Sequence, residues 1–149
     1  MNEVSEQIIA AAEARRAESI AFLRKLIALQ RQGEAAVQQC FADHLRDSGC
    51  QVEALSYVPS DVKMRHEFAE GEAMAREERA SIIARLSGTG GGPSLIFFGH
   101  PDGEPLKNTE TWEHDPFAGD ISDGRSHGWS VSNDLASIAI MAEAIKVIR

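Results

Sequence analysis

The stretch Leu95-Ile-Phe-Phe-Gly-His-Pro-Asp-Gly-Glu-Pro105 passes directly from four large apolar residues into a histidine, a carboxylate and two prolines. The run from Leu95 to Phe98 does not alternate between apolar and polar residues. It therefore predicts a strand over residues 94–98 that is buried on both faces, in the centre of a helix-covered sheet. Ligands collect at the carboxyl ends of strands in such sheets. His100 and Asp102 are thus the first candidates for a functional site.

The composition is that of an ordinary globular chain. Its 149 residues are 43% hydrophobic and 26% charged, which suits one domain with a core of its own. The net charge of −8 argues against nucleic-acid binding, because a phosphate binder needs a basic face. We expect no membrane anchor, since no apolar run could span a bilayer or form a signal peptide. Two cysteines, Cys40 and Cys50, indicate a reducing compartment, so the expected location is the cytoplasm.

The spacing of apolar residues predicts helices at both ends of the chain and strands between them. This order is typical of an α/β fold with an incomplete mixed sheet flanked by helices. The charged segment from Pro59 to Arg79 is expected to be partly helical and exposed. Helices are expected over about 5–48, a first from Ser5 to Gln30 and a second from Gly33 to a C-cap at Gly49. Strands and loops are expected over about 51–133, with strands at 51–58, 81–86 and 94–98 and a tight turn at Asp123-Gly124. A last helix is expected over about 135–149.

His100 and Asp102 have the pattern of a metal ligand and its support. An imidazole can bind a metal through one ring nitrogen while a nearby acid holds the other and fixes the tautomer. Asn133-Asp134, just ahead of the last helix, form a second polar cluster. His114 and His127 are interpreted as surface or loop-packing histidines.

Three motifs follow one another along the chain: Gly99-His-Pro-Asp102, Trp112-Glu-His-Asp-Pro-Phe117, and Gly119-Asp-Ile-Ser-Asp-Gly-Arg125 followed by Gly128. In this order they resemble the first half of the M20 metallopeptidases, the group of acetylornithine deacetylase and succinyl-diaminopimelate desuccinylase. The resemblance spans nearly the whole chain, and its specific part is the section from Trp112 to Arg125. It implies that residues 1–149 are the N-terminal portion of a zinc-peptidase-like catalytic domain. The implied substrates are N-acyl amino acids or small peptides, and the implied metal is zinc, with cobalt or manganese as alternatives.

The resemblance also implies the site residues. His100 would bind one metal, and Asp102 would be the catalytic-site acid that supports it. The family's bridging aspartate falls on Asn133, whose neutral oxygen is a poorer bridge between two cations than a carboxylate. Asp134 could replace it only through a shift of one residue, which turns a strand side chain to the other face. The expected metal ligands are therefore His100, Asn133 and Asp134, and no substrate-binding residue is predicted.

The sequence departs from the family in other respects as well. Trp129 and Ser130 replace an arginine and a glycine, and the family's glutamate pair and dimerisation domain have no counterpart. In the family the metal activates water that a glutamate deprotonates, so we expect the isolated chain to be inactive. One hypothesis is a split hydrolase completed by a second M20-like chain, or a homo-oligomer formed through an exposed sheet. The alternatives are a degenerate, non-catalytic binding or scaffolding subunit, and a truncated product of low solubility.

Overall fold

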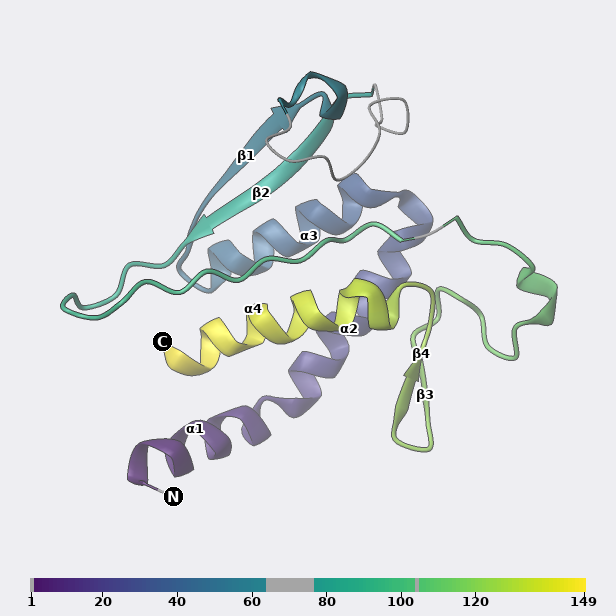
Figure 1. Cartoon of the computed structure of the whole chain (residues 1–149). Helices are drawn as coiled ribbons and strands as arrows, with labels where there is room; N and C mark the ends of the chain where they lie inside the picture. The colour runs from purple at the N-terminus through teal and green to yellow at the C-terminus, as the bar shows by residue number, and fades with distance from the viewer. Residues whose placement is uncertain (1, 64–76, 104) are drawn as a thin grey trace.

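The computed structural model describes residues 2–63, 77–103 and 105–149 and is a mixed α/β structure (Figure 1). Its helices lie near the two ends of the sequence and its strands between them. The helices are α1 (Glu3–Ala14), α2 (Arg16–Leu29), α3 (Glu34–Asp47) and α4 (Ala136–Ile148). The strands are β1 (Gln51–Tyr57), β2 (Arg79–Arg85), β3 (Asp120–Ser122) and β4 (Arg125–His127). Short turns are η1 (Gln30–Gln32), η2 (Pro59–Asp61), η4 (Thr109–Thr111) and the π-helical η5 (Val131–Leu135).

The first helix expected from the sequence is divided in two at Arg15. The side chain of Asn2 caps α1, because its Oδ1 accepts a hydrogen bond of 2.9 Å from the backbone N–H of Ser5. At Arg15 the backbone turns to φ −95° and ψ 0°, and α2 starts at the next residue. No glycine or proline marks this break, so the apolar spacing of the sequence did not reveal it.

The end of α3 confirms the predicted C-cap. Gly49 has a φ of +81°, in the left-handed region where a side chain is disfavoured. Its N–H donates to the carbonyl of Arg46 over 2.8 Å, and the N–H of Cys50 donates to Leu45 over 3.0 Å. These two bonds are those of a Schellman motif, which ends the helix and leads the chain into β1.

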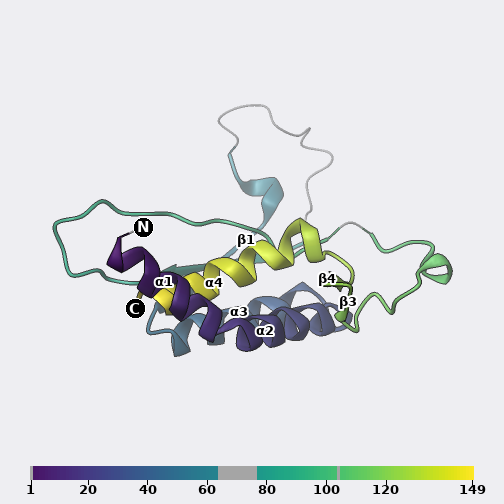
Figure 2. The same cartoon turned by 90° about the horizontal axis from the view of Figure 1, so that it is seen from below.

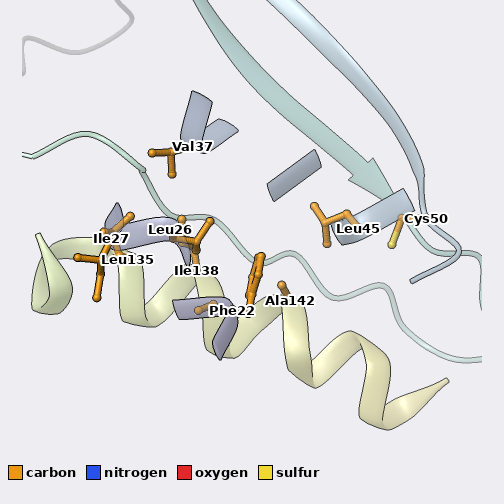
Figure 3. Close-up of a cluster of buried hydrophobic side chains, with 10 residues drawn as sticks. Phe22, Leu26, Ile27, Val37, Leu45, Cys50, Leu135, Ile138 and Ala142 are labelled. Atoms are coloured by element: carbon orange, nitrogen blue, oxygen red, sulfur yellow. The ribbon is translucent and has the colours of Figure 1, made fainter. Parts of the chain in front are cut away.

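The core lies between α2, α3 and α4. Figure 2 shows α4 crossing over the layer that α2 and α3 form, and Figure 3 shows the side chains that fill the contact. Leu26 and Ile27 come from α2, Val37 comes from α3, and all three are 0% exposed. Because α2 and α3 are close in sequence and α4 lies about a hundred residues later, the last helix closes the core. The remaining buried apolar members are Phe22, Leu45, Cys50, Leu135, Ile138, Ala139 and Ala142.

The strands form two separate antiparallel pairs, so the predicted mixed sheet is wrong. Strands β1 and β2 pair from Gln51–Arg85 to Tyr57–Arg79, and this hairpin packs on α3. Strands β3 and β4 pair around the Asp123-Gly124 turn, where both residues have positive φ (51° and 73°). That geometry confirms the tight turn expected from the dipeptide.

The strand predicted at 94–98 is also absent. Leu95, Ile96 and Phe98 are 76%, 82% and 88% exposed, and within the described ranges no strand pairs with this segment. Figure 1 shows it as an extended stretch in the long connection that follows β2. A run of apolar residues becomes a central strand only when neighbouring strands and covering helices meet it. Here the local pattern favoured a strand, but the partners it requires are missing from residues 2–63, 77–103 and 105–149.

Two further expectations concern the middle of the chain and the membrane. The helical part predicted between Pro59 and Arg79 falls largely on residues 64–76, which lie outside the described residues. Across the described part of the chain, none of the helices combines the length and the apolar character that crossing a bilayer requires.

A buried carboxylate on α4 connects the helices to one another. Glu143 on α4 is 5% exposed, and its Oε2 accepts from Nε and an Nη of Arg15 over 3.1 and 3.0 Å. The Oε1 of Glu143 lies 2.7 Å from Nε2 of His44 on α3, although these two atoms are not aligned as a hydrogen bond. The His44 ring in turn stacks on Phe22 of α2 at 3.7 Å. One side chain thus connects α4 to α3 and to the α1–α2 junction.

Replacing Arg15 by alanine should remove the hydrogen-bonded cation of the buried Glu143 carboxylate and leave only Lys146, whose Nζ lies 3.9 Å from Oε1. We expect the free energy of unfolding in urea to fall by about 3 kcal/mol, the usual cost of breaking a buried pair from one side. The matched control is Arg16→Ala, which removes the same side chain from the neighbouring exposed position and should change stability by no more than about 0.5 kcal/mol. Equal effects of the two substitutions would contradict the role assigned to Arg15.

The stability of the fold should also depend on pH through His44. Burial, and then the positive charge of Lys146, lower the pKa of His44 below its usual 6.5, despite the opposing effect of Glu143. The unfolded chain therefore binds the proton more readily, so the stabilisation is complete above pH 6.5 and declines as pH falls towards the folded pKa. The slope of unfolding free energy against pH from 7.5 to 5.5 should be smaller in His44→Gln. A variant with the unchanged slope would exclude His44 as its source.

Candidate functional site

His100 lies at the end of the exposed stretch, next to its predicted support. Its Nδ1 is 3.3 Å from a carboxylate oxygen of Asp102 and 3.1 Å from the backbone oxygen of the same residue. Both partners accept hydrogen bonds, so Nδ1 carries the proton and Nε2 keeps the lone pair that a metal could use. The two side chains are about half exposed. The structure thus places the two residues side by side, and the ligand role of His100 stays a prediction.

Asn133 and Asp134 occupy a kink within η5, and they are joined by a cis peptide bond. Asp134 approaches the histidine segment: its Oδ2 lies 3.4 Å from the backbone nitrogen of His100. Asn133 is exposed. The expectation from the sequence assumed that Asn133 and Asp134 end a regular strand, but they lie in a kink. Asp134 therefore approaches His100 without the one-residue shift that a strand would require. The structure thus places Asp134 against the backbone of His100, whereas Asp102 lies beside the His100 ring.

Gly99 makes this approach possible. A Cβ at this position would lie 2.5 Å from Cγ2 of Ile138 and 2.6 Å from Oδ2 of Asp134. Both distances are shorter than any ordinary carbon contact, so a side chain here would displace the side chains of Ile138 and Asp134.

The Trp112–Phe117 loop is fastened by its acid and its aromatic rings. Asp115 accepts a 2.9 Å hydrogen bond from the backbone N–H of Phe117 and pairs with Arg31. These contacts, the Phe117 hydrogen bond first, lower the pKa of Asp115. The guanidinium of Arg31 lies 5.0 Å from the centre of the Phe117 ring, and Trp129 meets that ring edge-on at 6.0 Å. The motif therefore positions the loop against η1, which directly follows α2, and the sequence did not reveal this role of Arg31.

The two histidines interpreted as loop residues lie together. The rings of His114 and His127 stack with their centres 4.0 Å apart and their planes 26° from parallel. Both line a cavity of about 560 Å³ that also contacts Trp112, Ser126 and Ser130. The sequence offered one signal: the Asp-Gly turn fixes the register of β3 and β4 and thereby the place of His127.

Segments of the chain are similar in sequence to known succinyl-diaminopimelate desuccinylases. Over 64 residues the chain is 41% identical to a succinyl-diaminopimelate desuccinylase of Methylorubrum extorquens, an alignment covering 43% of this chain and 16% of that protein. Over 100 residues it is 31% identical to the desuccinylase of Leptothrix cholodnii, covering 67% of this chain and 26% of the relative. The resemblance to the M20 family is confirmed.

The chain spans about a quarter or less of the length of these M20 relatives. A desuccinylase of Methylobacterium radiotolerans aligns over 103 residues at 32% identity, which is 22% of its length. No family model matches the chain, and no solved structure matches it. The similarity to these relatives therefore lies in aligned segments of 64 to 103 residues.

The M20 relationship implies a metal, and the described residues fit it only in part. His100 with Asp102 has the form of one ligand with its orienting acid. Asn133 is neutral and exposed, and among the described side chains no three of His, Cys, Asp or Glu surround a common point. A stable zinc site needs three or four protein ligands. The described residues thus provide one oriented imidazole.

Placing a methyl group at Gly99 tests the contact between the histidine segment and the kink. Gly99→Ala should lower the free energy of unfolding by about 1–3 kcal/mol through overpacking and should shift the backbone amide resonance of His100. Gly88→Ala is the matched control, because a Cβ there meets nothing within 4 Å. Unchanged stability and an unchanged His100 resonance in Gly99→Ala would contradict the close approach.

Proposed function

We propose that this chain contributes part of the catalytic layer of an M20-type, metal-dependent amidohydrolase acting on N-acyl amino acids or small peptides. The observation that carries the proposal is its identity of 31–41% with succinyl-diaminopimelate desuccinylases. The His100–Asp102 pair supports it, since its geometry is that of a metal ligand held in one tautomer. Zinc is the proposed metal, and cobalt or manganese could replace it.

The proposal includes a partner chain. We propose that the partner, a second M20-like chain or a further copy, supplies the glutamate pair that acts as base and ligand in the family. The exposed apolar segment Leu95–Phe98 supports this idea, because neighbouring strands from a partner would satisfy its backbone and cover its side chains. Both cysteines are free thiols, in keeping with the cytoplasmic location that we propose.

A non-catalytic binding or scaffolding subunit is the second candidate. The observation that favours it is Asn133, a neutral and exposed side chain where the family has its bridging carboxylate. The two candidates differ in what the assembled complex does: a split hydrolase gains zinc and turnover on assembly, whereas a scaffold gains neither.

The decisive experiment compares the chain alone with the complex that copurifies with it. N-succinyl-diaminopimelate and a panel of N-acetyl amino acids serve as substrates, with the zinc content measured on the same samples. We expect no turnover by the chain alone and zinc-dependent turnover by the complex. His100→Ala should reduce that turnover at least about 100-fold. Loss of a residue that only supports a metal ligand typically costs about 10- to 100-fold, and this substitution removes the proposed ligand itself.

Asn133→Asp provides the matched gain-of-function variant. If Asn133 lies at the bridging position, the added carboxylate should raise the zinc content and the turnover of the complex. Turnover by the isolated chain would contradict the need for a partner. If the complex has neither zinc nor activity, and the Asn133→Asp complex has neither as well, the result would favour the scaffolding alternative.

A further inference from the structure

A cavity of about 200 Å³ lies between α3, β2 and the segment that carries His100. Part of its lining is charged and comes from Glu34 on α3 and Arg79 on β2, and another part consists of His100 and Asp102. A water molecule takes up about 30 Å³ in the liquid, so the space equals about seven waters and suits one small molecule. Apolar side chains complete the lining: Phe41, Ile82, Pro101 and Ile138.

Glu34 and Arg79 form an ion pair within this lining. The side chain of Arg79 is 35% exposed and that of Glu34 is 27% exposed, so a molecule in the cavity can reach both. An ion pair with this exposure contributes little to stability, because water already solvates its charges. A ligand can therefore take the place of either partner at small cost.

The surroundings of the ion pair are held in place by two glutamine side chains. Nε2 of Gln38 donates to Oε1 of Glu34 and to the carbonyl oxygen of Ala80, both over 2.8 Å. This amide keeps the Glu34 carboxylate at the junction of α3 and β2 when Arg79 turns towards a ligand. Gln30, which is 6% exposed, donates from Nε2 to the carbonyl oxygen of Pro101 over 2.7 Å and so fixes the histidine segment.

A carboxylate next to a guanidinium can recognise the head of an amino acid. The guanidinium binds a carboxylate through two parallel hydrogen bonds, and the protein carboxylate accepts hydrogen bonds from an ammonium group. A ligand that has both groups replaces the ion pair of the protein with two ion pairs of its own. A ligand that has only one group leaves one protein charge without a partner, which is unfavourable.

We propose that this cavity binds the free ammonium and carboxylate groups of an amino acid, with Glu34 holding the ammonium and Arg79 the carboxylate. The second part of the inference rests on the proposed function. Because His100 lines the same cavity, a substrate whose free end lies here would have its amide near that histidine. The substrate class is thereby narrowed to diamino acids that are acylated on one nitrogen and keep a free amino-acid head at the other end.

The test titrates the full chain with L-norvaline and two matched analogues. Butylamine lacks the carboxylate of L-norvaline, and pentanoate lacks its ammonium. Binding is followed through the backbone amide resonances of Ala80, Ser81 and Gly99, which all belong to the lining. L-Norvaline should shift these resonances at millimolar concentration. Each analogue should bind at least about tenfold more weakly, since it loses hydrogen bonds to a charged group.

Variants of the ion pair separate recognition from folding. Glu34→Gln and Arg79→Gln should each weaken L-norvaline binding at least about tenfold. Arg79→Lys should have an intermediate effect, because lysine keeps the charge and loses the two-pronged geometry. The matched control is Arg85→Gln, which removes an exposed ion pair with Glu53 on the same hairpin, outside the cavity lining, and should leave binding unchanged. Circular dichroism and urea unfolding confirm that each variant is folded.

The same residues should govern substrate choice in an active complex. N-Succinyl-diaminopimelate should have a lower KM than N-succinyl-2-aminopimelate, which lacks the free ammonium, at a similar kcat. A group that binds substrate and transition state equally affects KM alone. Glu34→Gln should remove the difference in KM between the two substrates.

Three outcomes would overturn the site. Equal binding of L-norvaline and its two analogues means that the cavity does not recognise both charges. Unchanged affinity in folded Glu34→Gln and Arg79→Gln means that the ion pair only connects β2 to α3. Unshifted resonances of Ala80, Ser81 and Gly99 at millimolar L-norvaline mean that no amino acid binds in the cavity.

The binding measurement needs neither a metal nor a partner chain, so its result is independent of turnover. A chain that does not bind L-norvaline, within a complex that hydrolyses N-acyl amino acids, would remove this site and keep the proposed hydrolase. Selective binding of L-norvaline without turnover by the complex would keep the site and remove the hydrolase.

Discussion

The carboxylate of Glu143 is the contact on which the arrangement of the helices depends. It is almost fully buried, and it meets Arg15 at the α1–α2 junction and His44 on α3 from its place on α4. Apolar contacts alone would allow α4 to slide or rotate on the layer below it, because the hydrophobic effect has little directionality. A buried charge needs its partners in place, so it fixes the position of α4.

The position of α4 in turn determines the candidate site. The helix begins at Ala136, directly after the kink that holds Asn133 and Asp134, and its Ile138 touches Gly99 beside His100. The site is therefore the junction of two segments that have no regular structure of their own. Its geometry is set by the packing of a helix, whereas the sequence argument expected a sheet edge to set it.

Features encoded over a few residues could be predicted from the sequence. The C-cap at Gly49, the turn at Asp123-Gly124 and the last helix depend on local conformational preference, and all three were found. The contact between His100 and Asp102 is also local, because the two residues are neighbours in sequence. Features that depend on distant partners could not be predicted from the sequence. The run at 94–98 required other strands to pair with. Nothing in the local sequence distinguishes the buried Glu143 from an exposed glutamate. The His114–His127 stack requires both a loop conformation and a hairpin register.

The connection between the first and last helices has a kinetic consequence. Arg15 and Glu143 are separated by 128 residues, and the core between α2, α3 and α4 depends on contacts of similar range. Closing so long a loop costs entropy before any contact rewards it, and high contact order slows folding. During synthesis the apolar faces of α2 and α3 emerge long before the helix that covers them, so a ribosome-bound chain must keep Leu26, Ile27 and Val37 from associating with other polypeptides until α4 is made.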